Sequence, residues 1–305
     1  MSEPTRARPI AAIPTVWIDR VGPVDGIDVI AWDMDRPCPV DSLDYACVPY
    51  QNSPDVWGYL ATARIGCVQL LSAGFEDALD RIGSIDARIP LSELPGVPVP
   101  AVEGHGAELL SMRVAVPSGG EARVLVATGR VHLYEGYTPS QVCRLVRICA
   151  MTGIRAAFLT NAGGCLRDWK LGELMAIEDH FNFSGASPFE GPVFTDIWSI
   201  WSARFNSLLN GIVDRTGTYA LLRGPEFQTA AESRMLAANG VDNVGMSTIL
   251  EAIALHQLGV EVAGLSVVSD LSFDPAPTEH EDVLRAMAVA TPKVEAAITT
   301  CLSAI

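Results

Sequence analysis

From Gly66 onward, short apolar runs that end in glycine or polar residues alternate with segments of helical periodicity. The runs predicted to be strands are 67–71, 121–127, 156–160, 218–223 and 260–269. Helices are predicted at 139–153, 229–239, 249–258 and 279–302, the first of them stopped by Gly153. Strands and helices that alternate through short connections predict an α/β fold, a single domain with a central mixed, mostly parallel β-sheet flanked by helices.

The first sixty residues do not follow this pattern. Residues 1–60 are poorly periodic, rich in Pro, Asp and Gly, and carry isolated aromatic side chains. We therefore divide the chain into an N-terminal extension of unknown role, residues 1–60, and an α/β domain, residues 61–305.

Composition excludes several classes of protein. Hydrophobic residues make up 49% of the chain, which is enough for a large core and argues against intrinsic disorder. The 36 acidic against 21 basic residues give a net charge of −15, so nucleic acid is not expected as a partner. The mean hydropathy is +0.26, yet no apolar run approaches the ~18–20 residues of a membrane span. The seven cysteines are scattered, odd in number and without the spacing of a metal site, so we expect a cytoplasmic protein with no disulfides and no bound metal. Since no apolar run is long enough to span a bilayer, we also expect no membrane association.

Polar and glycine-rich residues occur where the predicted strands end. They are Arg130 with His132, 161–164, 224–228, 246–248 and Asp270. In open α/β sheets, ligands bind where strand ends meet loops. Five such clusters favour an enzyme.

The densest cluster is Gly129–Tyr137. Arg130 and His132 are two residues apart, so in an extended segment both point to one side. The arginine fork matches a phosphate or carboxylate. Residues 161–164 read as a turn whose N–H groups can face an anion, and Ser247 can cap a helix or share an anion with its N-terminus.

These motifs resemble one family. Residues 129–137, 160–164, 224–229, 244–248 and 280–283 occur in the order found in the trimeric purine nucleoside phosphorylases and the related methylthioadenosine phosphorylases. The resemblance runs from about Gly66 to about Met287. It implies a nucleoside phosphorylase-like fold, a role in purine salvage, and a homotrimer that splits a purine nucleoside with inorganic phosphate as co-substrate and with no cofactor.

The resemblance also implies roles for individual residues. Arg130, His132, the Ala162 N–H and Ser247 would bind phosphate, and Tyr134, Phe227, Met246 and His280 would line the ribose. Gly163, Tyr219, Gln228 and Asp270 would surround the base. His105 matches a histidine of the phosphate-side loop, and Phe194 matches, loosely, an aromatic lent to the neighbouring subunit. His132, Asp270 and His105 are the predicted catalytic groups.

The sequence departs from the family pattern at three places. Ala73 stands where the first phosphate loop has a hydroxyl, unless Ser72 takes over that contact. The base-binding glutamate is Gln228, and the asparagine near the purine 6-position is Asp270. An aspartate suits a 6-amino purine, whereas His280 is expected where a 5′-hydroxyl is bound.

Three hypotheses therefore stay open. The leading one is phosphorolysis of a purine nucleoside to a free purine and a pentose 1-phosphate. The second is the same reaction on adenosine or methylthioadenosine, favoured by Gln228 with Asp270. The third is a non-catalytic paralogue that binds a nucleoside, which Ala73 and Gln228 motivate and Arg130, His132 and Ser247 oppose.

Overall fold

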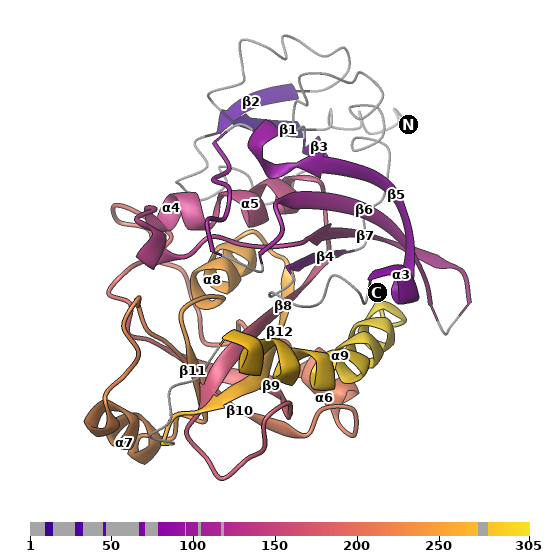
Figure 1. Cartoon of the computed structure of the whole chain (residues 1–305). Helices are drawn as coiled ribbons and strands as arrows, with labels where there is room; N and C mark the ends of the chain where they lie inside the picture. Colours follow the sequence, from indigo (N-terminus) through magenta and orange to yellow (C-terminus); the bar gives the residue numbers. More distant parts are fainter. Residues whose placement is uncertain are drawn as a thin grey trace, which may run out of the picture.

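The computed structural model describes residues 10–14, 28–32, 45–46, 67–70, 79–94, 96–102, 105–116, 119–273 and 280–305. Two sheets organise these residues (Figure 1). The smaller is a parallel sheet in the order β2-β1-β3, built from Ile10–Pro14 (β1), Asp28–Trp32 (β2) and Tyr45–Ala46 (β3). It lies within the predicted N-terminal extension, and the boundary at residue 60 stays a prediction.

The larger sheet is mixed and has the order β11-β10-β9-β12-β8-β4-β7-β6-β5. Its strands are Cys67–Leu70 (β4), Gly83–Pro90 (β5), Glu108–Ala115 (β6), Glu121–Ala127 (β7), Ala156–Cys165 (β8), Leu174–Asn182 (β9), Arg215–Leu221 (β10), Asn243–Gly245 (β11) and Glu261–Leu271 (β12). β11 also pairs with β8, so the five strands from β11 to β8 close into a barrel. Five pairings among these strands are parallel and four are antiparallel. The sheet is therefore mixed as expected, but its closure was not anticipated.

Helices cover both faces of this sheet. They are Leu79–Ile82 (α3), Pro139–Val142 (α4), Arg144–Met151 (α5), Ala203–Leu209 (α6), Ala230–Ala238 (α7), Ile249–Gln257 (α8) and His280–Leu302 (α9), with short 3-10 turns at Leu91–Glu93 and Leu133–Glu135. Side chains of α5 and α8 pack into one hydrophobic core, and those of α6 and α9 pack into a second core. Within the described residues, none of the helices is both long enough and apolar enough to cross a bilayer.

Local sequence signals explain several boundaries. Thr229 begins α7 because its hydroxyl accepts from the Glu232 N–H while the Glu232 carboxylate accepts from the Thr229 N–H. Gly153 has φ = 80°, a conformation that glycine adopts freely, and it follows α5 as predicted. The predicted helix 139–153 is divided at Cys143 into α4 and α5.

One local prediction is wrong. Residues 161–164 were expected to form a turn, but they continue strand β8 to Cys165. Backbone pairing with β12 along the whole segment, and with β11 at Gly164 and Cys165, holds these residues extended. Barrel closure supplies the second partner, and a local sequence reading does not anticipate it.

Candidate active site

A cavity of about 360 Å³ lies at the carboxyl ends of β8 and β12, beside β11 and the loops that follow β7 and β10. Eleven of the predicted site residues line it: His105, Arg130, His132, Tyr134, Ala162, Gly163, Phe227, Gln228, Met246, Ser247 and Asp270. β8 and β12 run parallel, so their carboxyl ends meet at one edge. The strand-end clusters of the sequence are thereby brought into one site.

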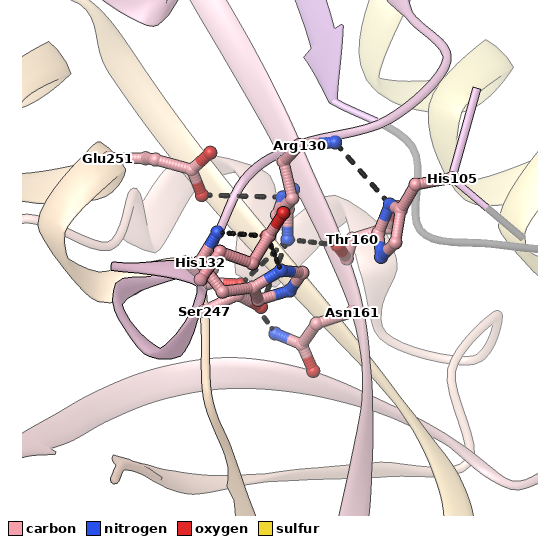
Figure 2. A network of polar contacts seen from close by, with 9 residues as sticks. His105, Arg130, His132, Thr160, Asn161, Ser247 and Glu251 are labelled. Atoms are coloured by element: carbon pink, nitrogen blue, oxygen red, sulfur yellow. Dashed lines mark hydrogen bonds and ion pairs between the residues drawn. The ribbon is translucent and has the colours of Figure 1, made fainter. Parts of the chain in front are cut away.

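Arg130 is the buried cation of this site. Its side chain is only 3% exposed. Its Nη1 donates to the Thr160 carbonyl at 2.7 Å, to Ser247 Oγ at 3.2 Å and to Thr248 Oγ1 at 3.1 Å (Figure 2). Because these groups come from β8 and from the start of α8, the guanidinium joins two elements that are far apart in the sequence. Arg130 and Ser247, both predicted to bind phosphate, are therefore hydrogen-bonded neighbours.

An acidic partner faces the same guanidinium. Glu251, in the first turn of α8, places Oε2 3.5 Å from Arg130 Nε (Figure 2). Burial raises the pKa of Glu251 above its usual value, although Arg130, His132 and the Thr248 N–H act to lower it. The pair is desolvated on both sides, so loss of either charge leaves the other uncompensated.

His132 is held by a carboxylate. Glu135 Oε1 accepts from the His132 backbone N–H at 2.7 Å and lies 3.0 Å from ring Nδ1. Burial alone would raise the pKa of Glu135, but its hydrogen bonds with His132 and the Ala101 N–H lower it, so the carboxylate is ionised near neutral pH. An ionised carboxylate only accepts, so Nδ1 carries the proton and Nε2 remains for the cavity.

Two further rings surround His132. The Tyr134 ring stacks on it with centroids 4.7 Å apart, and burial raises the Tyr134 pKa to about 12. His105 meets His132 edge to face at 5.1 Å. Burial, together with the nearby His132 and Arg130, lowers the His105 pKa to about 3, so this ring is neutral at physiological pH. Its Nδ1 can therefore accept the hydrogen bond from the Arg130 backbone N–H, at 3.4 Å.

Gln228 and Asp270 carry the polar groups expected at the base. Gln228 Nε2 donates to Ser272 Oγ at 2.8 Å. The β8–β12 register shifts between Val268 and Asp270. Adjacent strand residues normally point to opposite faces, and this bulge allows both Ser269 and Asp270 to line the cavity. Burial raises the pKa of Asp270, against a weak bond from Ser269.

Four predicted residues are not placed in the cavity by the structure. Tyr219 is fully buried in β10 and lies behind the wall at Gly245, so the expectation that it borders the base is not met. Phe194 is 95% exposed and lies away from the cavity lining of its own chain. Ser72 falls outside the described residues, as does Ala73. His280 begins α9, and its side chain lies outside what the structure describes.

Comparison with known proteins identifies the family of the chain. The family model of the phosphorylase superfamily matches residues 70–303. The purine nucleoside phosphorylase of Cellulomonas sp is 40% identical over 233 residues, covering 74% of this chain and 82% of the relative. That of Mycobacterium leprae (strain TN) is 41% identical over 223 residues, covering 71% and 81%. The chain belongs to the purine nucleoside phosphorylase family.

A solved structure supports the same family fold. Schistosoma mansoni purine nucleoside phosphorylase in complex with inosine superposes with a TM-score of 0.71 at 25% identity, covering 81% of this chain and 93% of that chain. The nucleoside phosphorylase-like fold expected from the motifs is therefore confirmed.

The sequence analysis did not predict the residues that position the binding groups of this purine nucleoside phosphorylase family member. Glu251 lies within an apolar helix, and its charge among buried residues was the available signal. Glu135 follows His132 by three residues, a spacing at which their side chains can meet in a turn. Ser272 carried no signal, and Thr248 was noted only as part of the cluster 246–248, because the contacts of both hydroxyls join segments that are distant in the sequence. Among the described residues, no cluster of His, Cys, Asp and Glu has the arrangement of a metal site.

Proposed function

We propose that this chain catalyses phosphorolysis of a purine nucleoside, giving a free purine and a pentose 1-phosphate. The observation that carries the proposal is one cavity lined by Arg130, His132 and Ser247 together with Gln228 and Asp270. The first three suit an anion, and the last two suit the polar edge of a base. A volume of about 360 Å³ lies within the range of small-molecule sites, about 300–1,000 Å³.

The proposed residues divide the reaction between them. Arg130, the Ala162 N–H and Ser247 hold phosphate beneath the sugar, where the Arg130 charge offsets that of the anion. Ser72 is a further candidate for this contact. The bond between the sugar C1′ and the purine nitrogen breaks with its electrons going to the purine, and a phosphate oxygen bonds to C1′. Tyr134, Phe227, Met246 and His280 are proposed to line the ribose.

Proton transfer falls to His132 and Asp270. Glu135 fixes the His132 ring, so that Nε2 can exchange a proton with phosphate. Asp270, in its protonated state, can donate to the purine nitrogen N7 as the base leaves, and its raised pKa favours that state. His105 is neutral and is proposed to close the phosphate side rather than to supply charge.

The second candidate concerns the base. Asp270 and Gln228 offer acceptors to an exocyclic amine, which favours adenosine-type or 5′-methylthioadenosine substrates over inosine and guanosine. Gly163 lies in the same wall and leaves room for the base. In the non-catalytic alternative, these groups bind a nucleoside without turnover.

We also propose a homotrimer in which Phe194 reaches a neighbouring subunit. Phe194 and Trp198 are each 95% exposed, which is unusual for large aromatic side chains and suits an interface. We further propose that the enzyme acts in purine salvage in the cytoplasm. It uses inorganic phosphate as co-substrate and needs no cofactor. Four free, buried cysteines in the described part of the chain are compatible with a reducing compartment.

The test is a phosphate-dependent release assay on inosine, guanosine, adenosine and methylthioadenosine. We expect free purine to appear only with phosphate, and adenosine or methylthioadenosine to be preferred. Arg285→Met, at an exposed arginine of α9, is the matched control for Arg130→Met. Tight purine binding without turnover would favour the binder, and faster inosine and guanosine cleavage would refute the base assignment.

A further inference from the structure

Thr248 has an unusual backbone conformation. Among the residues that the structure describes, it is the only non-glycine residue with a positive φ, which is 83°. A β-branched residue at positive φ is a genuine outlier, and this backbone strain persists only where the surrounding structure imposes it. Strained residues of this kind cluster at functional sites.

The hydroxyl of Thr248 is not used for helix capping. Thr248 is the N-cap of α8, yet its side chain makes no capping hydrogen bond. Instead Oγ1 lies 3.1 Å from Arg130 Nη1, 2.9 Å from Asn161 Nδ2 and 3.1 Å from Ser247 Oγ. The residue is 2% exposed and does not line the cavity, so it cannot touch a ligand there itself.

Both sides of this contact are anchored. The Asn161 amide oxygen accepts from Ser266 Oγ at 2.6 Å, and Ser266 Oγ in turn accepts from Asn243 Nδ2 at 2.8 Å. These residues belong to β8, β12 and β11 of the closed barrel. On the helix side, Glu251 faces Arg130 Nε and accepts from the Thr248 backbone N–H. Thr248 is therefore tied to Arg130 directly through its hydroxyl and indirectly through Glu251.

We infer that Thr248 is a positioning residue for phosphate: its hydroxyl holds the Arg130 guanidinium and the Ser247 hydroxyl in register with the barrel. The strained backbone is what directs Oγ1 toward β8 and away from the helix N-terminus. This inference rests on the proposed function, because it assigns Arg130 and Ser247 to phosphate. It predicts that loss of the Thr248 hydroxyl weakens phosphate binding while the nucleoside contacts are spared.

The experiment compares Thr248→Val, Thr248→Ser and Thr248→Gly in the full chain. Valine keeps the shape without the hydroxyl, serine keeps the hydroxyl, and glycine removes both the hydroxyl and the strain. Thr291→Val is the matched control, because Thr291 is a buried α9 threonine whose hydroxyl, among the residues that the structure describes, donates to the helix carbonyl of Met287 alone. Calorimetric titration with inorganic phosphate, thermal unfolding, and initial rates with phosphate or nucleoside varied are measured for each.

We expect the valine and glycine variants to bind phosphate about 10- to 100-fold more weakly, with the nucleoside KM changed by less than about threefold. The serine variant and Thr291→Val should stay within about threefold of the original chain. Phosphate binding within twofold in a folded valine or glycine variant would overturn the inference, as would equal losses of phosphate and nucleoside affinity. Titration with phosphate needs no turnover, so a chain that binds phosphate but cleaves no nucleoside refutes the proposed function and still tests Thr248.

Discussion

Replacement of Arg130 by methionine tests the core of the site. Methionine fills similar space without charge. It removes the three Nη1 hydrogen bonds and leaves Glu251 as a buried carboxylate without its cation. Both side chains are 3% exposed, so the penalty belongs to the buried class, about 3–5 kcal/mol of the free energy of unfolding. Loss of charge-assisted bonds to phosphate should weaken its binding about 10- to 100-fold.

The double variant Arg130→Met with Glu251→Gln separates these two effects. Glutamine leaves no buried charge, so most of the lost stability should return, whereas phosphate affinity should not. Urea unfolding reports the stability, and calorimetric titration reports the phosphate affinity. The stability loss of Arg130→Met should also shrink as the pH falls, because the raised pKa of Glu251 lets the orphaned carboxyl protonate.

Two results would refute this reasoning. A double variant that is no more stable than Arg130→Met would show that Glu251 is not the source of the penalty. Recovery of phosphate affinity in the double variant would show that Arg130 does not bind the anion.

Three further predictions concern the rest of the site. Asp270→Asn should lower the adenosine-to-inosine ratio of kcat/KM by about tenfold. It should also remove the fall in adenosine kcat/KM as the pH rises through the raised pKa of Asp270; an unchanged pH profile would contradict the proton-donor role. Glu135→Gln should cost about 1–3 kcal/mol of stability at pH 7 by urea unfolding. This difference in stability between the original chain and the variant should shrink as the pH falls through the lowered pKa of Glu135, because a carboxyl whose pKa is lowered by folding stabilises the protein only while it is ionised. A stability difference that stays constant with pH would argue against the His132 contact. Gly245→Ala would press a methyl group against the Tyr219 hydroxyl, costing about 1–3 kcal/mol in thermal unfolding, and adding Tyr219→Phe should recover part of it; no recovery would place the clash elsewhere.

Periodicity and capping signals predicted much of the fold. The strand Glu121–Ala127 and helices α7, α8 and α9 lie within one or two residues of their predicted bounds, because hydrophobic periodicity and, at α7, the Thr229 cap act locally. Strand β9 and the pairing of β11 with β8 were missed. Barrel closure depends on contacts between segments some 80 residues apart, and no local pattern carries that information.

The site divides in the same way. Arg130, His132 and Ser247 were predicted because phosphate chemistry requires cations and donors, and a strand end is where such residues become exposed to a ligand. Tyr219 was misplaced, since an aromatic ring next to a base and an aromatic ring behind the wall have the same local sequence. The β12 bulge, which lets Ser269 and Asp270 line one cavity, also exists only in the paired sheet.

By itself, the sequence determined the alternation of elements, the acidic net charge and the chemical types gathered at the strand ends. These follow from side-chain periodicity and charge, which are properties of neighbouring residues. Only the tertiary structure decided that Arg130 faces Glu251 and that the Thr248 hydroxyl turns toward β8. Contacts of this kind depend on distances of about 3 Å between distant segments, and packing fixes such distances only once the whole barrel has closed.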